Sequence, residues 1–307
     1  MAPTPSLSTP MPFSLLLPIF LLAGLGALLA KLPWLRPSWH TGVTELTAKF
    51  LVPALLLAGA WRTGIPSSLS WKVLCAFYLP LGLSFAGARL LARRHGTGAA
   101  SALAATYSNT VFVGVPVLVQ VLGEGSLQFA YPVIAFHSLF CFTLYHLSED
   151  GAASGWFGPV LATLKNPIVA ALLLGLALNL GGIALPPVLD RVLAMLGAAA
   201  LPCALLSLGA SVVSLKPAKW SATGAIVLAK LVFLPLGVAL LAVFVLHLPA
   251  TAAMVLVVLA SCPVGVNAAF VVKPAGGGAQ LVNSAILLSS LLCAATIPAW
   301  LWALRHL

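Results

Sequence analysis

Hydrophobic residues gather into ten long runs along the chain, and short polar segments separate these runs. The runs cover residues 12–31, 41–60, 70–92, 99–121, 126–147, 164–184, 190–213, 220–246, 250–272 and 279–304. A helix of about 20 apolar residues is long enough to cross the hydrocarbon core of a bilayer. The pattern therefore predicts an all-α membrane protein with ten transmembrane helices. Residues 1–11 contain three prolines and predict a short, disordered N-terminal lead-in.

The two halves of the chain resemble each other. Five short matches recur in the same order, at offsets of 149 to 155 residues. They pair Pro18 with Pro167, Pro53 with Pro202, Leu79–Gly82 with Leu234–Gly237, Val113–Pro116 with Val264–Asn267, and Ser138–Cys141 with Ser290–Cys293. The matches predict a five-helix unit over 12–147, a cytoplasmic connector over 148–163 and a second unit over 164–307. An odd number of helices per unit inserts the second unit upside down, which gives the inverted repeat of many secondary transporters.

Composition identifies lipid as the solvent of this chain. Of its 307 residues, 61% are hydrophobic and 7% are charged, whereas a soluble domain carries about 25% charged residues. The formal charge of +10 does not indicate nucleic-acid binding, because the basic residues lie singly or in pairs between the apolar runs. All five cysteines fall inside apolar runs without a C-x-x-C motif, which predicts reduced packing residues.

Lysine and arginine in the loops predict the orientation of the chain in the membrane. With the N-terminus outside, the inner loops carry Lys31, Arg36, Arg93, Arg94, Lys165, Lys216, Lys219 and Lys273. The outer loops then carry Arg62, Lys72, Arg191 and Arg305. Since cytoplasmic loops are enriched in basic residues, both termini are expected outside the cytoplasm, in a multi-pass protein of the cell's inner membrane.

Two of the runs contain helix-breaking residues at matching places. Pro116 and Gly114 interrupt the run over 99–121, and Pro263 and Gly265 interrupt the run over 250–272. Unwound backbone inside a membrane needs polar partners, and five side chains lie within reach: Ser108, Asn109, Thr110, Ser261 and Asn267. If both helices unwind near the midplane, their half-helix ends converge on one point and suit an anionic group. The alternative is a pair of proline-kinked helices whose polar side chains only satisfy the backbone.

Two ionisable residues lie deep inside the runs. Lys230 lies about ten residues into its run, and a lysine near the bilayer centre is a functional candidate by default. It could supply positive potential to a bound anion, or it could be a structural residue that binds freed carbonyls. His137 could couple transport to protons, since the ordinary pKa of histidine lies near neutral, or it could be a hydrogen-bonded packing residue.

Enzymatic chemistry is not expected of this sequence. It contains no H-E-x-x-H motif, and the interiors of the runs contain no aspartate, which excludes an aspartyl dyad. No metal, cofactor or nucleic acid is expected. A channel is harder to separate from a carrier, because a pore and a carrier share many sequence features.

The residues around the first interruption carry a family resemblance. Asn109 to Val117, Asn-Thr-Val-Phe-Val-Gly-Val-Pro-Val, resembles the Asn-Thr-x-x-x-Gly-x-Pro segment of the auxin efflux carrier family. Further similar features are Lys165 to Pro167, Leu201-Pro202 followed by Ser207 to Ala210, and Lys230 ahead of Leu234-Pro235. The similarity runs from about residue 15 to residue 300.

The resemblance implies a fold like that of bile-acid symporters and sodium/proton antiporters. Helices 3–5 and 8–10 would form a moving core, and helices 1, 2, 6 and 7 a scaffold at a homodimer interface. The implied function is secondary active or facilitative transport of small organic anions, such as malonate, malate or auxin-like acids, by an elevator motion. Asn109 and Pro263 take the positions of the family's functional asparagine and proline. The alternative is an anion channel, or a carrier of non-anionic molecules, on the same fold.

The chain departs from its relatives in two ways. No acidic residue lies near the interruptions, where the sodium-coupled cousins of this fold hold a carboxylate. Ser68 precedes Lys72 where some auxin exporters have an aspartate. Both departures argue against auxin itself and against simple sodium coupling.

Overall fold

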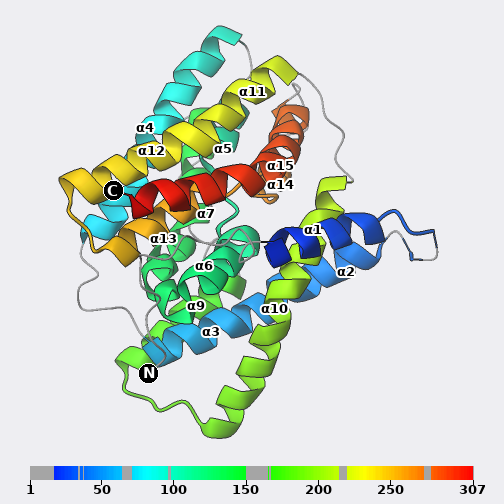
Figure 1. Cartoon of the computed structure of the whole chain (residues 1–307), viewed down its shortest axis with the longest axis vertical. Helices are drawn as coiled ribbons and strands as arrows, with labels where there is room; N and C mark the ends of the chain where they lie inside the picture. Colours follow the sequence, from blue (N-terminus) through cyan, green and yellow to red (C-terminus); the bar gives the residue numbers. More distant parts are fainter. Residues whose placement is uncertain are drawn as a thin grey trace.

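The computed structural model describes residues 17–33, 35–36, 38–63, 71–95, 98–149, 165, 167–213, 220–272 and 278–306, and they are almost entirely helical (Figure 1). The predicted lead-in over 1–11, nearly all of the connector over 148–163, and Ser68 lie outside the described residues. The expected all-α class is confirmed for the described part of the chain, where an isolated bridge between Ser108 and Val264 is the one β-type pairing.

The first half of the chain holds α1 to α7. Their bounds are α1 Leu17–Leu29, α2 Trp39–Leu46, η2 Thr47–Leu51, α3 Val52–Thr63, α4 Trp71–His95, α5 Gly98–Thr106, η3 Thr110–Gly114, α6 Val115–Leu122, η4 Glu124–Ser126 and α7 Leu127–Glu149. The second half holds α9 Pro167–Leu180, α10 Pro187–Val213, α11 Trp220–Leu228, η6 Ala229–Phe233, α12 Leu234–Ala239, η7 Leu240–Val245, α13 Ala250–Ser261, α14 Ala268–Val271 and α15 Gly278–Arg305.

Each predicted apolar run contains helix in the structure, but not every helix is long enough to span a membrane alone. Among the described residues, six continuous helical stretches are sufficiently long and apolar, the longest being Gly278–Arg305. Four other apolar helices are shorter: Phe20–Leu29, Thr110–Leu122, Pro167–Leu180 and Ala250–Ser261. Two of these short helices, Thr110–Leu122 and Ala250–Ser261, belong to the two interrupted runs. The arrangement of ten spans in an inverted repeat stays a prediction.

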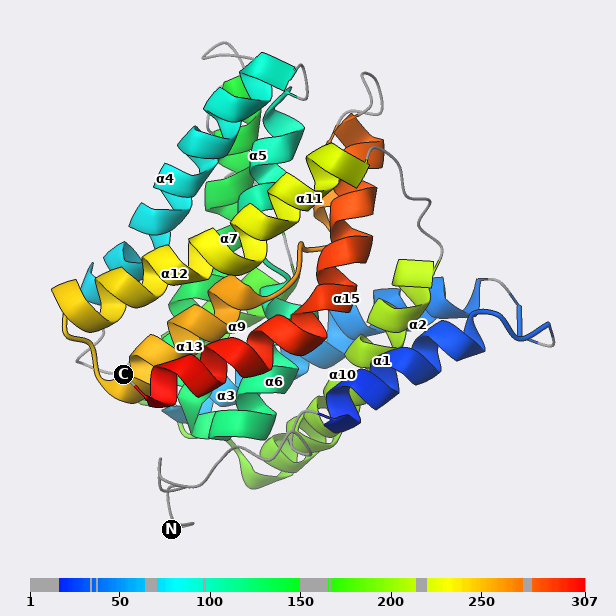
Figure 2. The ribbon, with the colours of Figure 1, turned by 45° about the horizontal axis from the view of Figure 1, so that its top comes forward.

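The helices form two packed groups (Figures 1 and 2). In one group, α3 packs along α9 and α1 along α10, and α10 also contacts α2 and α3. In the other group, α4, α5, α7, α11, α12, α13 and α15 contact one another. The groups meet where α7 touches α3 and α9, and where η3 touches α10. This border matters because the interrupted helices end there.

Close packing between α1 and α10 depends on two glycines. A Cβ added at Gly209 would lie 1.8 Å from the carbonyl oxygen of Ala23, and one at Gly26 would lie 2.1 Å from that of Leu206. Small residues allow two helix backbones to approach closely where lipid provides no hydrophobic driving force between helices. These glycines therefore set the distance between α1 and α10.

Prolines explain where the helices widen into π-turns. Three of the four π-helical segments in the described chain end two residues before a proline: η2 before Pro53, η3 before Pro116 and η6 before Pro235. Proline lacks an N–H and its ring clashes with the carbonyl four residues earlier. For Pro235 that carbonyl belongs to Leu231, which accepts a hydrogen bond of 2.9 Å from the indole Nε1–H of Trp300. The tertiary structure thus satisfies a carbonyl that the proline leaves free.

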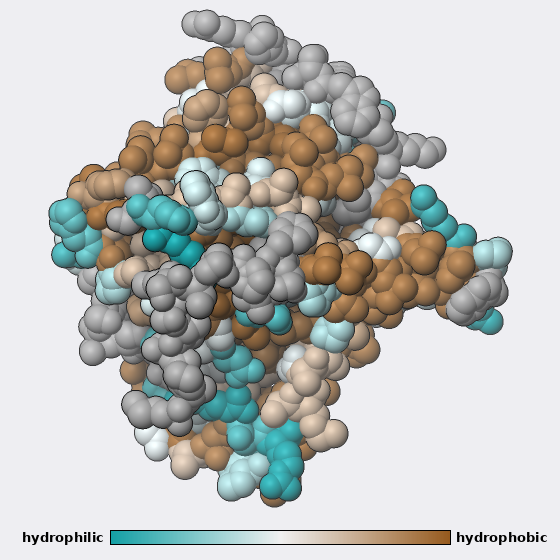
Figure 3. Space-filling view, in the orientation of Figure 1, coloured by the Kyte–Doolittle hydropathy of each residue, from teal (hydrophilic) through white to brown (hydrophobic). Residues whose placement is uncertain are grey.

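Much of the exterior of the protein is apolar. Leu79, Leu83, Val188, Met195 and Trp302 each expose more than half of their surface. Hydrophobic residues gather over α11 and over the arm formed by α1 and α2 (Figure 3). A soluble monomer rarely exposes such continuous apolar surface. The surface therefore agrees with a multi-pass membrane protein whose outer face contacts lipid.

Candidate functional site: a crossing of two broken helices

Two helix breaks cross near the centre of the protein. The first break separates α5 from η3 at residues 107–109, and the second separates α13 from α14 at residues 262–267. An antiparallel bridge pairs Ser108 with Val264. The N–H of Asn109 donates to the carbonyl of Pro263 at 2.8 Å, and the N–H of Gly265 donates to the carbonyl of Tyr107 at 3.0 Å. The backbone groups freed by the two breaks therefore satisfy each other.

Local two-fold symmetry relates these hydrogen bonds. Rotating Ser108 onto Val264 places Asn109 on Gly265 and Tyr107 on Pro263, so each backbone bond maps onto the other. This correspondence corrects the sequence match between Val113–Pro116 and Val264–Asn267. The equivalent of the second break is the segment Tyr107–Asn109, about two turns before Gly114.

The first break also lies earlier than the prediction placed it. Pro116 lies inside the continuous helix η3–α6, because the π-turn over Thr110–Gly114 accommodates its ring and its missing N–H. The helix begins instead at Asn109, whose side chain caps it. Asparagine is a preferred N-cap, since its oxygen satisfies an N–H of the first turn.

The second break forms where the prediction placed it. The backbone of Cys262 is extended, with φ −58° and ψ 149°. Proline disfavours a helical conformation in the residue before it, so Pro263 ends α13 at Ser261. The hydroxyl of Ser261 donates to the carbonyl of Val258 at 2.9 Å. Ser261 therefore belongs to the last turn of α13 and does not line the crossing.

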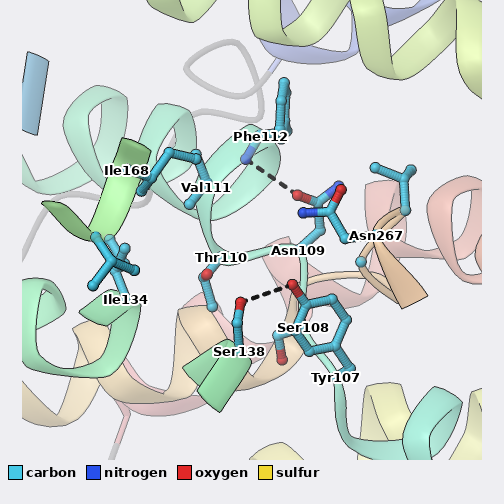
Figure 4. Close-up of a pocket in the computed structure, with 13 residues that line it drawn as sticks. Tyr107, Ser108, Asn109, Thr110, Val111, Phe112, Ile134, Ser138, Ile168 and Asn267 are labelled. Carbon is cyan, nitrogen blue, oxygen red and sulfur yellow. Dashed lines mark hydrogen bonds between the residues drawn. The ribbon is translucent and has the colours of Figure 1, made fainter. Parts of the chain in front are cut away.

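Asn109 is the polar centre of the crossing. Its Oδ1 accepts a hydrogen bond of 3.1 Å from the N–H of Phe112 (Figure 4). Its Nδ2 is buried, and no described residue accepts a hydrogen bond from it. The buried hydroxyl of Ser108 likewise has no partner in the described part of the chain. Several buried side-chain atoms of the described chain lack a hydrogen-bond partner, and Ser108 and Asn109 are the two residues among them that line the cavity at the crossing, where a ligand could supply an acceptor.

A small cavity adjoins these donors at the border between the two helix groups. It has a volume of about 30 Å³ and is lined by Tyr107 to Phe112, Ile134, Ser138, Ile168, Val169 and Gly265 to Asn267. Asn109 and Asn267 lie close together in the view of Figure 4. The volume suits about one or two water molecules, and a dicarboxylate is larger. Binding of an organic anion therefore requires the cavity to widen.

Gly265 allows the two breaks to approach. A Cβ at this position would lie 2.5 Å from Cε1 of Tyr107, a distance that real Cβ atoms do not adopt. The aromatic ring of Tyr107 is in turn fixed by its hydroxyl, which lies 3.1 Å from the hydroxyl of Ser138. The glycine is thus required by close packing at the crossing.

Lys230 lies behind the second break and does not line the cavity. Its side chain is fully buried, and its Nζ donates to the carbonyl of Ala260 at 2.5 Å, in the last turn of α13. Cations are favourable near helix C-termini, which carry a partial negative charge. The structural interpretation of Lys230, binding a carbonyl near a helix break, therefore has a clear contact to support it.

His137 also lies behind the crossing, on α7. Its Nε2 accepts a hydrogen bond of 2.8 Å from the N–H of Ser108. Its ring stacks on Tyr107 with centroids 5.1 Å apart and meets Phe77 edge-on. His137 is 1% exposed. Of the predicted site residues, the structure thus brings Ser108, Asn109, Thr110, Gly265 and Asn267 to the cavity, and Pro263 and His137 to the backbone bridge.

Sequence reasoning did not predict three contributors to this region. Tyr107 and Ser138 line the cavity, and Ser289 on α15 accepts the N–H of Val264 at 2.9 Å. One signal could have indicated Ser289. It lies 152 residues after His137, the same offset that relates Ser138–Cys141 to Ser290–Cys293.

Comparison with known proteins supports a transport function. A family model described as "Membrane transport protein" matches residues 159–301. No curated protein matches the chain. The matched region contains α9 to α14 and most of α15, including the second break and Lys230. The model of this family, the family of auxin efflux carriers that the sequence resembles, thus matches just under half of the chain, and members of the family are transporters rather than enzymes.

Proposed function

We propose that this chain is a secondary carrier of small organic anions, and that the substrate binds at the crossing of the two broken helices. The observation that carries the proposal is the pair of buried donors without described partners, Asn109 Nδ2 and the Ser108 hydroxyl. A carboxylate offers acceptor oxygens and no donor, so it complements such a site. Substrates of the class of malonate, malate or an auxin-like acid have this chemistry.

The electrostatics of the crossing favour an anion. The N-terminus of the helix η3–α6 begins at the cavity and carries a partial positive charge. The opposing negative end is the C-terminus of α13, where the Lys230 ammonium binds the carbonyl of Ala260. None of the described residues that line the cavity is acidic. We therefore expect a positive electrostatic potential at the cavity, and Lys230 contributes to it without touching the substrate.

The two helix groups suggest how the carrier moves. Ile168 and Val169 of α9 line the cavity on one side, and α7, η3 and the second break line it on the other. We propose that α1, α2, α3, α9 and α10 form a scaffold at a homodimer interface. The remaining helices form a core that slides along this scaffold. The bridge joins the break of the first half to the break of the second half, an arrangement that the inverted repeat of such an elevator carrier would produce.

Thermal stabilisation of the purified protein tests the substrate class. A ligand that binds only the folded state raises apparent stability by mass action, by about 2.7 kcal/mol at 100 times its Kd. We expect malonate or malate to raise the melting temperature of the wild type, and indole-3-acetate serves as the comparison with auxin itself.

The Asn109→Asp variant is the matched control for that measurement. It keeps the oxygen that caps Phe112 but replaces the free amide donor with a repelling carboxylate. We expect the stabilisation by anions to disappear in this variant. Stabilisation by neutral compounds alone would show that the anion proposal is wrong, and an equal shift in Asn109→Asp would remove Asn109 from the site.

A further inference from the structure

Two side chains in equivalent positions accept hydrogen bonds from the backbone N–H groups of the two breaks. His137 on α7 accepts the N–H of Ser108 at 2.8 Å, and Ser289 on α15 accepts the N–H of Val264 at 2.9 Å. Ser108 and Val264 are the residues that the antiparallel bridge pairs. The local two-fold symmetry of the crossing therefore extends to these two side chains, although one is an imidazole and the other a hydroxyl.

Each acceptor is oriented by its own helix. The Nδ1 of His137 lies 3.9 Å from Sγ of Cys141, one turn further along α7. The hydroxyl of Ser289 donates to the carbonyl of Ile286 at 3.2 Å, one turn back along α15. In both cases the hydrogen of the side chain is directed along its own helix. The lone pair is left to face the crossing.

This geometry fixes the chemical state of His137. A backbone N–H can only donate, so the Nε2 that faces Ser108 must be unprotonated and the neutral ring carries its hydrogen on Nδ1. Protonation of Nε2 would place two N–H groups against each other. It would also bury a second charge in a core that already contains Lys230. The other titratable side chains packed on the ring are Tyr107 and Cys141.

We infer that His137 and Ser289 are a matched pair of positioning residues, which hold the two broken segments against each other by accepting the N–H groups of Ser108 and Val264. In this role His137 is a permanent acceptor and not the proton carrier that its position in the sequence also allowed. These two hydrogen bonds give the proposed substrate site a rigid wall, and they are independent of the identity of the substrate.

Hydrogen exchange at the crossing tests this inference without any substrate. We expect His137→Leu to speed amide exchange in residues 107–109 about tenfold, because a net hydrogen bond is lost. The bridge couples the two segments, so exchange at the amides of Val264 and Gly265 should also rise. Ser289→Ala should give the same pattern, beginning at Val264. Ser290→Ala is the matched control, because the Ser290 hydroxyl has no partner in the described chain and its loss should leave exchange unchanged.

His137→Gln separates the two roles of the histidine. Glutamine places an amide oxygen about as far along the side chain as Nε2, and it does not titrate, so it should restore slow exchange at residues 107–109. Uptake of labelled malonate by proteoliposomes should keep the wild-type pH profile in this variant. If His137→Gln exchanges as fast as His137→Leu, or if it abolishes the pH dependence of uptake, the inference is overturned.

If His137→Leu does not fold, Ser289→Ala and His137→Gln still test the roles of the two acceptors. Absence of malonate uptake in the wild type would contradict the proposed function and leave the exchange result valid.

Discussion

Asn109 combines two tasks that separate substitutions can distinguish. Its Oδ1 caps the helix η3–α6 through Phe112, and its Nδ2 faces the cavity without a described partner. The first task stabilises the fold and the second is available to a ligand. The sequence predicted the residue but could not predict this division, because it depends on which way the amide points after the helix begins at residue 109.

Truncation of Asn109 should affect both tasks. We expect Asn109→Ala to lower the free energy of unfolding by about 1 kcal/mol, the usual cost of removing an N-cap. Transport should fall much more, while insertion into the membrane continues because the apolar runs are unchanged. Melting curves and uptake by proteoliposomes measure the two effects. Wild-type flux in Asn109→Ala would contradict a role for this side chain in binding.

Lys230 is expected to act on the substrate at a distance. Replacing it with methionine keeps most of the length of the side chain but removes the charge that faces the carbonyl of Ala260. We expect Lys230→Met to weaken the binding of an anion about tenfold, since charges separated by protein still interact by about 1–2 kcal/mol. The rise in melting temperature during a titration with malonate measures this affinity. An unchanged anion affinity would leave Lys230 with its structural role alone.

At the scale of the elements, the crossing depends on an unusually close approach of two backbones. Gly265→Ala would place a Cβ 2.5 Å from the ring of Tyr107. We expect this substitution to destabilise the protein by about 1–3 kcal/mol, as overpacking does elsewhere. Gly24→Ala is the control, because α1 has open space at that glycine. Its melting temperature should stay equal or rise, since alanine favours helix. Equal melting temperatures for both variants would contradict the close approach of the two breaks.

The apolar runs predicted these elements well, and the fine structure of the breaks only in part. Pro263 ends α13 because a proline restricts the residue before it, a local effect that the sequence reveals. Pro116 does not end its helix, because a π-turn absorbs it. Whether a proline breaks or only widens a helix depends on tertiary partners such as Trp300, which satisfies the carbonyl freed by Pro235. Partners this distant in the sequence leave no local pattern.

Across the whole molecule, the described helices divide into two groups, and the candidate site lies at the border between them. The internal repeat anticipated a crossing between two interrupted helices. It did not give the register, because short apolar matches can slip by several residues. The antiparallel bridge between Ser108 and Val264 defines that register through its backbone hydrogen bonds.

The orientation in the membrane also belongs to this scale. With both termini outside, the segment between α1 and α2 faces the cytoplasm and the segment between α9 and α10 faces outward. We expect a membrane-impermeant thiol reagent to label Ala184→Cys in intact cells and to label Ser38→Cys only after the membrane is opened. Both positions are exposed, and the native cysteines lie in helices and in the second break, so the wild type controls for background. The reverse pattern of labelling would invert the proposed topology.

Counterflow of labelled malonate in proteoliposomes tests the central claim most directly. A carrier that binds anions at the crossing should show saturable uptake driven by unlabelled malonate inside the vesicle. In Asn109→Asp, counterflow should be lost while the variant still inserts and folds. Counterflow that persists unchanged in Asn109→Asp would contradict the site, and flux that never saturates would indicate a channel in place of a carrier.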